Sequence, residues 1–350
     1  MCNNCIFISF NTDMKLTKSL LLLFILGFFG CVKPEDPVTT CSTDNLLDSF
    51  TTQDGLEVFI YENGELYIQE EANCVFETLY FNPSQLANSY KFSSTDTLLI
   101  AGSTLFPVKN NYLEDFESGT SINDLFVASV SDTGLYWTSF TLQSPEVLTV
   151  DDYVTLRKCI LNGSCTFKDN KIEFSEDPVD ATNRVFKFSS VAPTEEMVTA
   201  KASISSQLNY FTQTSEVWFQ ADYYIESGMP FSLVDFESGY FAQSPGPRVV
   251  IKNGKLAMEN KFGAKILHEN TTNTTVPTNN WFTIKVHIKY NSKDTGLIEL
   301  WQDGEELIST SGISLPLSNA IQDILEVGVT ATPEGCVLYM DNIRISENPF

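Results

Sequence analysis

The chain has 350 residues, 43% of them hydrophobic and 12% aromatic, which is enough for one large folded body plus a small module. Its 45 acidic residues outnumber its 21 basic residues, giving a formal net charge of −24. Such a charge predicts repulsion from nucleic acid and from anionic membrane surfaces, so the sequence excludes nucleic acid as a partner.

The beginning of the chain resembles a bacterial lipoprotein export signal. Lys15 and Lys18 precede an uncharged apolar run at residues 20–29, and Gly30-Cys31 closes the run. A membrane-spanning helix needs about 20 apolar residues, so this run is short for a span and typical of a signal-peptide core. The small residue before the cysteine is what lipoprotein processing requires.

This pattern predicts a lipid anchor. We expect Met14 to be the true start, residues 1–30 to be the signal peptide, and Cys31 to carry the lipid. Residues 31–40 contain two prolines and would form a tether. The predicted location is the bacterial outer membrane, with the protein lipid-anchored and exposed at the cell surface. An uncleaved signal anchor is the alternative.

The cysteines of the mature chain indicate disulfides, which an exported protein can form. Cys159 and Cys165 flank a turn-like Ile-Leu-Asn-Gly-Ser loop and are predicted to pair. Cys41 with Cys74 is a plausible second pair. Cys336 lies in an apolar strand pattern and is predicted to be a buried thiol.

Strand and turn patterns dominate the rest of the chain. Asn63-Gly64, Asn253-Gly254 and Asp303-Gly304 each separate alternating apolar runs, as tight hairpin turns do. The predicted strands are residues 56–61, 65–69, 217–225, 231–236, 248–251, 282–290, 296–301, 325–329 and 336–345. A short helical turn is predicted at residues 317–325, and residues 195–206 are ambiguous.

The predicted organisation is all-β. Residues 41–108 would form a small N-terminal β module. Residues 112–348 would form the main antiparallel sandwich, with a long excursion at about 130–175 that holds the predicted Cys159–Cys165 disulfide.

Residues 281–307 are the most informative segment. Phe282, Ile284, Val286, Ile288 and Tyr290 alternate with polar residues, and a Gly-Leu-Ile-Glu-Leu-Trp strand follows, closed by an Asp-Gly turn. The segment resembles the concanavalin-like, laminin-G-like jelly roll. More narrowly, residues 180–348 resemble heparin-lyase-I-type polysaccharide lyases. This resemblance implies a jelly-roll β-sandwich and a polysaccharide or surface-glycan partner.

The chain ends in a Tyr-Met-Asp-Asn-Ile-Arg-Ile-Ser strand that resembles the last strand of many carbohydrate-binding jelly rolls. Their first strand often begins like the Asp-Phe-Glu sequence at residues 115–117. In such modules the two terminal strands pair and can share a structural calcium ion. The resemblance therefore implies calcium held by Asp115, Glu117 and Asp341, whose hard oxygen ligands suit this ion.

A polysaccharide lyase needs a base to remove the C5 proton and a group that neutralises the uronate carboxylate. The window from residue 248 to 293 holds eight basic residues against two acidic ones, and it includes both histidines of the chain. The candidate catalytic residues are therefore His287, Tyr290, Arg248 and Lys285. A solvated face of lysines explains the same window.

The predicted strand at residues 231–239 argues against the lyase hypothesis. In the lyases that the chain resembles, the strand comparable to residues 231–239 carries a histidine beside polar groups. Here Asp235-Phe236-Glu237 occupies the position, and two carboxylates would repel a uronate.

Three functions stay open at this point. The first is a surface-anchored glycan-binding sandwich without catalysis, using Lys285, Lys289, Trp301, Trp218 and Tyr240. The second is a polysaccharide lyase that cleaves an anionic glycan by β-elimination. The third is a structural or adhesive surface protein. Convergence of Lys285, His287, Arg248 and a tyrosine would favour the lyase.

Overall fold

The computed structural model describes residues 41–51, 57–61, 65–70, 73–79, 97–100, 104–127, 134–143, 149–195, 199–238, 245–262, 266–318 and 320–350. The predicted signal peptide, Cys31, the tether and the Asn63-Gly64 turn lie outside these residues. Within the described ranges, no helix is both long enough and apolar enough to span a membrane.

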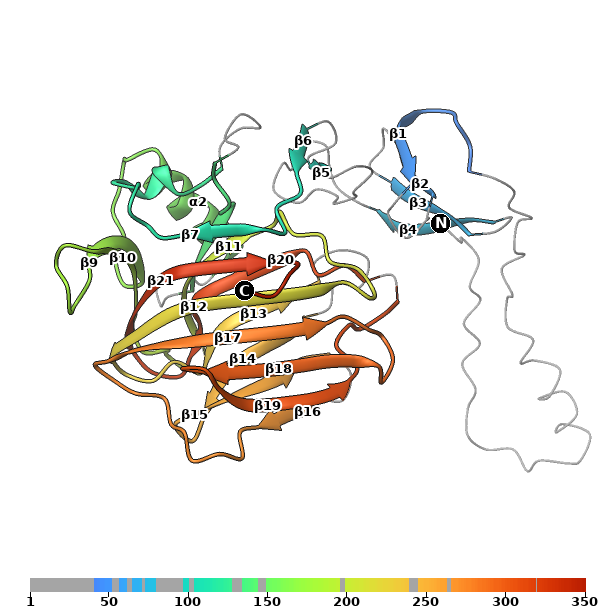
Figure 1. The fold of residues 1–350 in the computed structure, drawn as a ribbon. Helices are drawn as coiled ribbons and strands as arrows, with labels where there is room; N and C mark the ends of the chain where they lie inside the picture. Colours follow the sequence, from blue (N-terminus) through green and yellow to red (C-terminus); the bar gives the residue numbers. More distant parts are fainter. Residues whose placement is uncertain are drawn as a thin grey trace, which may run out of the picture.

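The main body is an antiparallel jelly-roll β-sandwich, as the sequence predicted. Its eight-stranded sheet has the order β19-β18-β17-β12-β21-β10-β9, and β7 also pairs with β21 (Figure 1). The strands are β7 (Tyr112–Glu114), β9 (Lys171–Glu176), β10 (Arg184–Ser190), β12 (Glu216–Ser227), β17 (Trp281–Lys289), β18 (Gly296–Gln302), β19 (Glu305–Gly312) and β21 (Cys336–Ser346).

The second layer is a seven-stranded sheet of order β16-β15-β14-β13-β20-β11-β8. Its strands are β8 (Ser139–Gln143), β11 (Ala200–Ser206), β13 (Ser232–Glu237), β14 (Pro247–Lys252), β15 (Lys255–Asn260), β16 (Ile266–Glu269) and β20 (Ile324–Thr332).

The remaining elements are shorter. A separate four-stranded sheet, β1-β2-β3-β4, precedes the sandwich, followed by a β5-β6 pair. Their bounds are β1 (Leu46–Thr51), β2 (Glu57–Tyr61), β3 (Glu65–Glu70), β4 (Asn73–Leu79), β5 (Thr97–Ile100) and β6 (Thr104–Pro107). Two helices are described, the 3-10 helix η1 (Ile122–Asp124) and α2 (Val150–Leu161).

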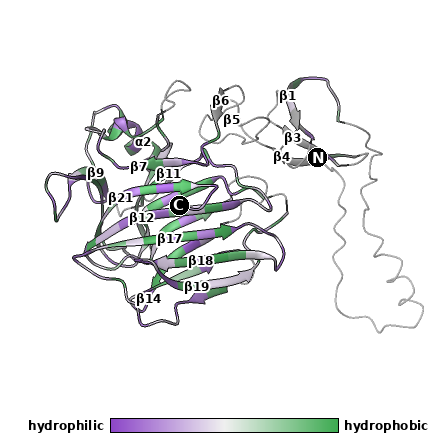
Figure 2. Cartoon of the chain, viewed as in Figure 1, coloured by the Kyte–Doolittle hydropathy of each residue, from purple (hydrophilic) through white to green (hydrophobic). Residues whose placement is uncertain are grey.

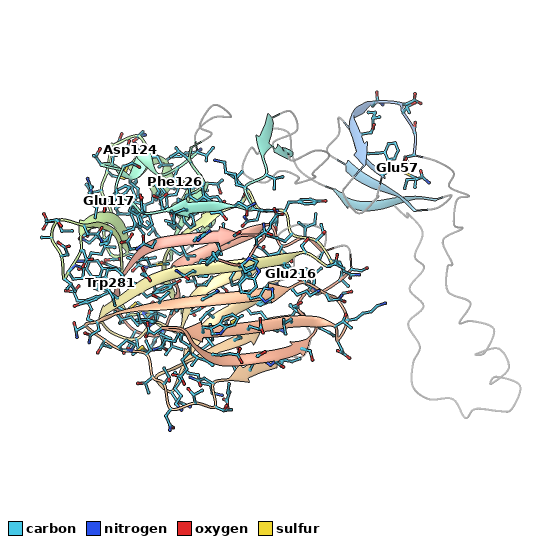
Figure 3. The ribbon with its side chains drawn as sticks, in the orientation of Figure 1. Glu57, Glu117, Asp124, Phe126, Glu216 and Trp281 are labelled. Atoms are coloured by element: carbon cyan, nitrogen blue, oxygen red, sulfur yellow. A yellow bond between two sulfur atoms is a disulfide. The ribbon has the colours of Figure 1, made fainter. Side chains whose placement is uncertain are left out.

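Side-chain alternation explains why the two sheets stack. On β17, Phe282, Ile284, Val286 and Ile288 point into the core, and β12 buries every second residue in the same way. Figure 2 shows hydrophilic and hydrophobic residues succeeding one another along these strands. In Figure 3, Glu216 and Trp281 mark opposite ends of the β12–β17 pair.

Two predicted hairpins are confirmed. Asn253-Gly254 joins β14 to β15, and Asp303-Gly304 joins β18 to β19. All four residues have positive φ, from 51° to 83°, as two-residue hairpin turns of this handedness require.

Three segments differ from the sequence expectation or were left open by it. The described residues among 317–325 form no helix, and β20 begins at Ile324. The ambiguous segment 195–206 contains strand β11. Helix α2 was not predicted, because its apolar residues do not make a clear helical face and several of its residues are β-branched, which lowers helix propensity. Thr149 caps this helix by accepting a hydrogen bond from the backbone N–H of Asp152.

Candidate functional site

A line of polar side chains crosses the outer face of the seven-stranded sheet. Neighbouring residues of the line are direct partners in the antiparallel register, so their side chains share one face. With strands about 4.8 Å apart, six strands place its ends roughly 24 Å apart. We call it the polar row, and its members, in order from β8 to β15, are Ser139, Ser205, Glu326, Asp235, Arg248 and Glu259.

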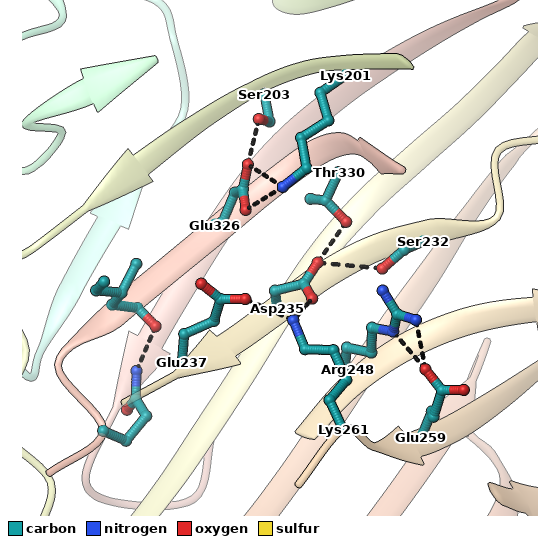
Figure 4. A network of polar contacts seen from close by, with 12 residues as sticks. Lys201, Ser203, Ser232, Asp235, Glu237, Arg248, Glu259, Lys261, Glu326 and Thr330 are labelled. Atoms are coloured by element: carbon teal, nitrogen blue, oxygen red, sulfur yellow. Dashed lines mark hydrogen bonds and ion pairs between the residues drawn. The ribbon is translucent and has the colours of Figure 1, made fainter. Parts of the chain in front are cut away.

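Glu326 occupies the centre of the polar row and is only 6% exposed. Its carboxylate accepts a hydrogen bond from Ser203 Oγ at 2.5 Å and lies 3.3 Å from Lys201 Nζ (Figure 4). Burial raises the pKa of Glu326, Lys201 opposes the rise, and the charges of Asp235 and Glu237 add to it. The net effect is a carboxyl group that holds its proton more tightly than an ordinary glutamate.

Asp235, 2% exposed, lies opposite Glu326, and its pKa is shifted in the opposite direction. Burial alone would raise its pKa, but the ammonium of Lys261, 2.5 Å away, and a hydrogen bond from Thr330 bring the pKa below its ordinary value. Ser232 Oγ donates to the same carboxylate at 3.1 Å. Asp235 therefore loses its proton more readily than an ordinary aspartate, and Glu326 less readily than an ordinary glutamate.

The remaining charges of this face are also paired. Lys261 Nζ contacts Glu237 at 2.5 Å as well as Asp235, so one ammonium bridges two carboxylates. Arg248 donates to Glu259 Oε2 from Nε at 2.7 Å and from its terminal nitrogen at 2.5 Å. Three cations thus oppose four carboxylates in and beside the polar row, and Figure 4 shows these residues on neighbouring strands.

The described strand residues of this face include neither a histidine nor a tyrosine. His268 on β16 pairs with Met258, whose side chain lies in the core, so His268 belongs to the other face of the sheet. Burial lowers the pKa of His268. Tyr240 lies outside the described residues.

The four predicted catalytic residues do not form one site. Arg248 belongs to the polar row, whereas Lys285 and His287 project from β17 in the eight-stranded sheet. Tyr290 is fully buried in the core, and burial raises its pKa well above the ordinary value. The basic window is divided because β14, β15 and β16 belong to the seven-stranded sheet, whereas β17 belongs to the eight-stranded sheet.

The predicted ligand-binding residues of the eight-stranded sheet do gather. The rings of Trp218 and His287 stack with centroids 3.8 Å apart, and Trp301 lies 6.2 Å from Trp218. Lys285 Nζ is 5.0 Å from the Trp218 ring and 5.6 Å from that of Trp301. Lys289 pairs with Glu216 at 3.3 Å.

The residues proposed for calcium are engaged locally. Asp115 accepts from the Glu117 backbone N–H, and Glu117 accepts from the Arg184 backbone N–H. Asp341 accepts from Asn183, and burial raises its pKa to about 6. Across the described ranges, no three His, Cys, Asp or Glu side chains converge as metal ligands would. Calcium at these residues stays a prediction. The terminal strands β7 and β21 do pair.

Disulfides join Cys41 to Cys74 and Cys159 to Cys165. Cys336 is a buried free thiol, as predicted.

Sequence reasoning missed Lys201, Ser203, Glu326 and Thr330 as members of the site. One sequence signal could have found part of the site. Lys201, Ser203 and Ser205 place a polar residue at every second position, which indicates one polar face of a strand. Glu326 is the single acidic residue of an otherwise mostly apolar strand, and no neighbouring sequence motif indicates a functional role for it.

Comparison with known proteins points to one family. A family model described as "Polysaccharide lyase" matches residues 146–344. No curated protein matches the chain.

Similar solved structures include an endo-β-1,4-glucuronan lyase from the fungus Trichoderma reesei, at 12% identity and a TM-score of 0.42, covering 51% of this chain and 87% of that one. Another is the cellulose induced protein Cip1, at 12% identity and a TM-score of 0.44, covering 68% and 97%. A third is an alginate lyase from Aplysia kurodai, at 14% identity and a TM-score of 0.37, covering 59% and 97%.

Proposed function

Because this chain belongs to the polysaccharide lyase family, we propose that it binds an anionic polysaccharide across the polar row and cleaves it by β-elimination. The observation that carries the proposal is the pair Asp235 and Glu326. They are direct cross-strand partners, each has a lysine against it, and their pKa values are displaced in opposite directions. Paired groups whose environments separate their pKa values are typical of acid–base sites.

The proposed reaction acts on a uronate residue with a sugar linked at O4. A base removes the C5 proton, the C4–O4 bond breaks, and the electrons of the C5–H bond become the C4=C5 double bond. The departing O4 takes a proton, so the products are an unsaturated uronate and a shortened chain.

Glu326 is our candidate for both proton transfers. Its raised pKa makes it a stronger base than an ordinary carboxylate when ionised, and once protonated it can return the proton to O4. Lys261 is our candidate for neutralising the uronate carboxylate, which makes the C5 proton more acidic. The uronate would replace Glu237, the more exposed of the two carboxylates that Lys261 bridges.

The test incubates the soluble protein with alginate, glucuronan, heparin and pectin, and follows the absorbance of the new C=C bond. A rise with at least one substrate supports the lyase, and an unchanged absorbance with all four contradicts it. Glu326→Gln serves as the matched variant, because it keeps an acceptor for Ser203 but cannot take up a proton.

A second candidate function is polysaccharide binding without cleavage. It is favoured by a specific observation. Lys201, Lys261 and Arg248 already pair with carboxylates, so they are less able to neutralise the uronate carboxylate as β-elimination requires. Retention on an immobilised polysaccharide with no absorbance change would support this function. Failure to bind any of the four polysaccharides would count against it.

We also propose that Cys31 anchors the protein to the outer membrane, facing the cell surface. The support is the sequence pattern of residues 14–31. Metabolic labelling with an alkyne fatty acid should tag the wild-type protein and not Cys31→Ser. Equal labelling of both proteins would contradict the anchor.

A further inference from the structure

The ion pair between Arg248 and Glu259 in the polar row leaves two polar atoms without partners. The two residues are direct cross-strand partners on β14 and β15. Arg248 Nε and one terminal nitrogen both contact Glu259 Oε2, at 2.7 Å and 2.5 Å. Within the described residues, the other terminal nitrogen of Arg248 and the second carboxylate oxygen of Glu259 have no hydrogen-bond partner (Figure 4).

The Arg248–Glu259 pair is held in place and still reaches solvent. The guanidinium carbon of Arg248 lies over the ring of Phe231, 4.9 Å from its centroid, and this contact restricts the guanidinium plane. The side chains of Arg248 and Glu259 keep 15% and 16% of their exposure. A hydrogen bond made in such a partly shielded place is stronger than one made in open water.

The unpartnered atoms of the Arg248–Glu259 pair offer a donor beside an acceptor. The opposite charges of the pair compensate each other, so it attracts a carboxylate less than an unpaired cation would. The remaining terminal nitrogen of Arg248 can donate, and the remaining oxygen of Glu259 can accept. A sugar hydroxyl does both, and two hydroxyls on adjacent carbons therefore match the pair, one accepting from Arg248 and the other donating to Glu259.

The pair lies beside the proposed catalytic residues. Arg248 is one strand from Asp235 and two strands from Glu326, which is roughly 5 Å and 10 Å along the polar row. A polysaccharide that follows the row would therefore place a neighbouring sugar over the pair when the cleaved uronate lies at Glu326. We propose that Arg248 and Glu259 bind two adjacent free hydroxyl groups of that neighbouring sugar. The inference rests on the proposed binding of polysaccharide across the polar row, and it specifies which sugars are accepted there.

This recognition selects against substituted sugars. An O-acetyl group has no O–H hydrogen to donate to Glu259, and it adds bulk over the pair. A site that hydrogen-bonds a hydroxyl rejects an analogue without it, because the polar groups of the site are then left unpaired. The substrate class is therefore a polyuronate whose hydroxyls on adjacent ring carbons are free.

The test compares the affinity of the soluble protein for alginate with its affinity for the same alginate after full O-acetylation. Affinity electrophoresis in the cold measures binding and does not require cleavage. Arg248→Met/Glu259→Met removes both partners together, so neither charge is left unpaired. Lys252→Met/Glu269→Met is the matched control, because it removes an ion pair of the same sheet outside the polar row. Thermal unfolding checks that each variant is folded.

We expect the wild type and the control to bind alginate about tenfold more tightly than O-acetylated alginate, or more, since one hydrogen bond to a charged group contributes on the order of a factor of ten. In Arg248→Met/Glu259→Met the two affinities should differ by less than about twofold, because the groups that discriminate are absent. The wild-type ratio in this variant would overturn the proposal. Equal wild-type affinities for the two alginates would also overturn it, as would undetectable binding of alginate.

Failure of this inference is distinguishable from failure of the proposed lyase. If the affinity ratio depends on the Arg248–Glu259 pair but no polysaccharide gives an absorbance rise, the lyase is contradicted and hydroxyl recognition stands. If the wild type cleaves O-acetylated alginate as fast as alginate, the lyase is supported and hydroxyl recognition by the pair is contradicted.

Discussion

Asp235 and Glu326 face each other directly across strands β13 and β20, and both carboxyl groups are almost completely buried. Like charges in this position destabilise a sheet unless cations or protons compensate them. Here the ammonium of Lys261 compensates the charge of Asp235. The ammonium of Lys201 and the raised pKa of Glu326 together compensate the charge of Glu326. Burying these charges makes the protein less stable than a pair of apolar residues at the same positions would. Such costly buried ionisable groups are common at functional sites.

Lys261→Ala should destabilise the protein strongly. The substitution leaves Asp235 buried and unpaired, and removing one partner of a buried ion pair costs about 3–5 kcal/mol. Urea unfolding measures the loss. Lys252→Ala is the control, because its ion pair with Glu269 is exposed and contributes about 0–1 kcal/mol. Similar losses in both variants would show that Lys261 does not compensate a buried charge.

The stability difference between Glu326→Gln and the wild type should depend on pH. The pKa of Glu326 is raised in the folded state above its ordinary 4.5, so the folded protein binds more protons than the unfolded chain above pH 4.5. The wild type should therefore lose stability from this group as pH rises through the folded pKa, and the glutamine variant should not.

Denaturant titrations of both proteins between pH 4.5 and 8 check this dependence. The free energy of unfolding of the variant, relative to that of the wild type, should increase with pH. A constant difference would mean that the pKa of Glu326 is the same in the folded and unfolded states.

Gly328→Ala should destabilise the sheet beneath the polar row. Gly328 has φ of +109°, and an added Cβ would lie 2.6 Å from the Phe188 ring. Backbone strain and overpacking together should cost more than about 2 kcal/mol. Gly312→Ala is the control, because nothing lies within 4 Å of its Cβ position and its φ is not in the left-handed region. Equal thermal midpoints for the two variants would contradict the predicted clash.

Most of the sandwich could be predicted because its signals are local. The alternation at residues 282–290 shows which side chains enter the core, and Asn-Gly and Asp-Gly pairs show where hairpins turn. Helix α2 was missed because its apolar residues do not make a clear helical face. Residues 317–325 were misassigned because short apolar runs do not distinguish helix from strand.

The candidate site depends on pairings that local signals do not reveal. Asp235 meets Glu326 only because β13 pairs with β20, about 90 residues further along the chain. Arg248 and Lys285 lie in the same basic window of the sequence, but their strands belong to different sheets. Charge counting along the chain therefore predicted one basic site, whereas the fold makes two faces of different character.

The most direct test of the lyase site compares cleavage by the wild type, Glu326→Gln and Glu269→Gln on the uronate polysaccharide that gives the largest absorbance rise. Glu269 is the control because it is an exposed glutamate of the same sheet, paired with Lys252 outside the polar row. Loss of a proton-transfer group should lower kcat about 100-fold or more in Glu326→Gln. Glu269→Gln should keep the wild-type rate, and thermal unfolding checks that all three proteins are folded at the assay temperature. Wild-type cleavage by folded Glu326→Gln would contradict the assignment of the polar row as the catalytic site.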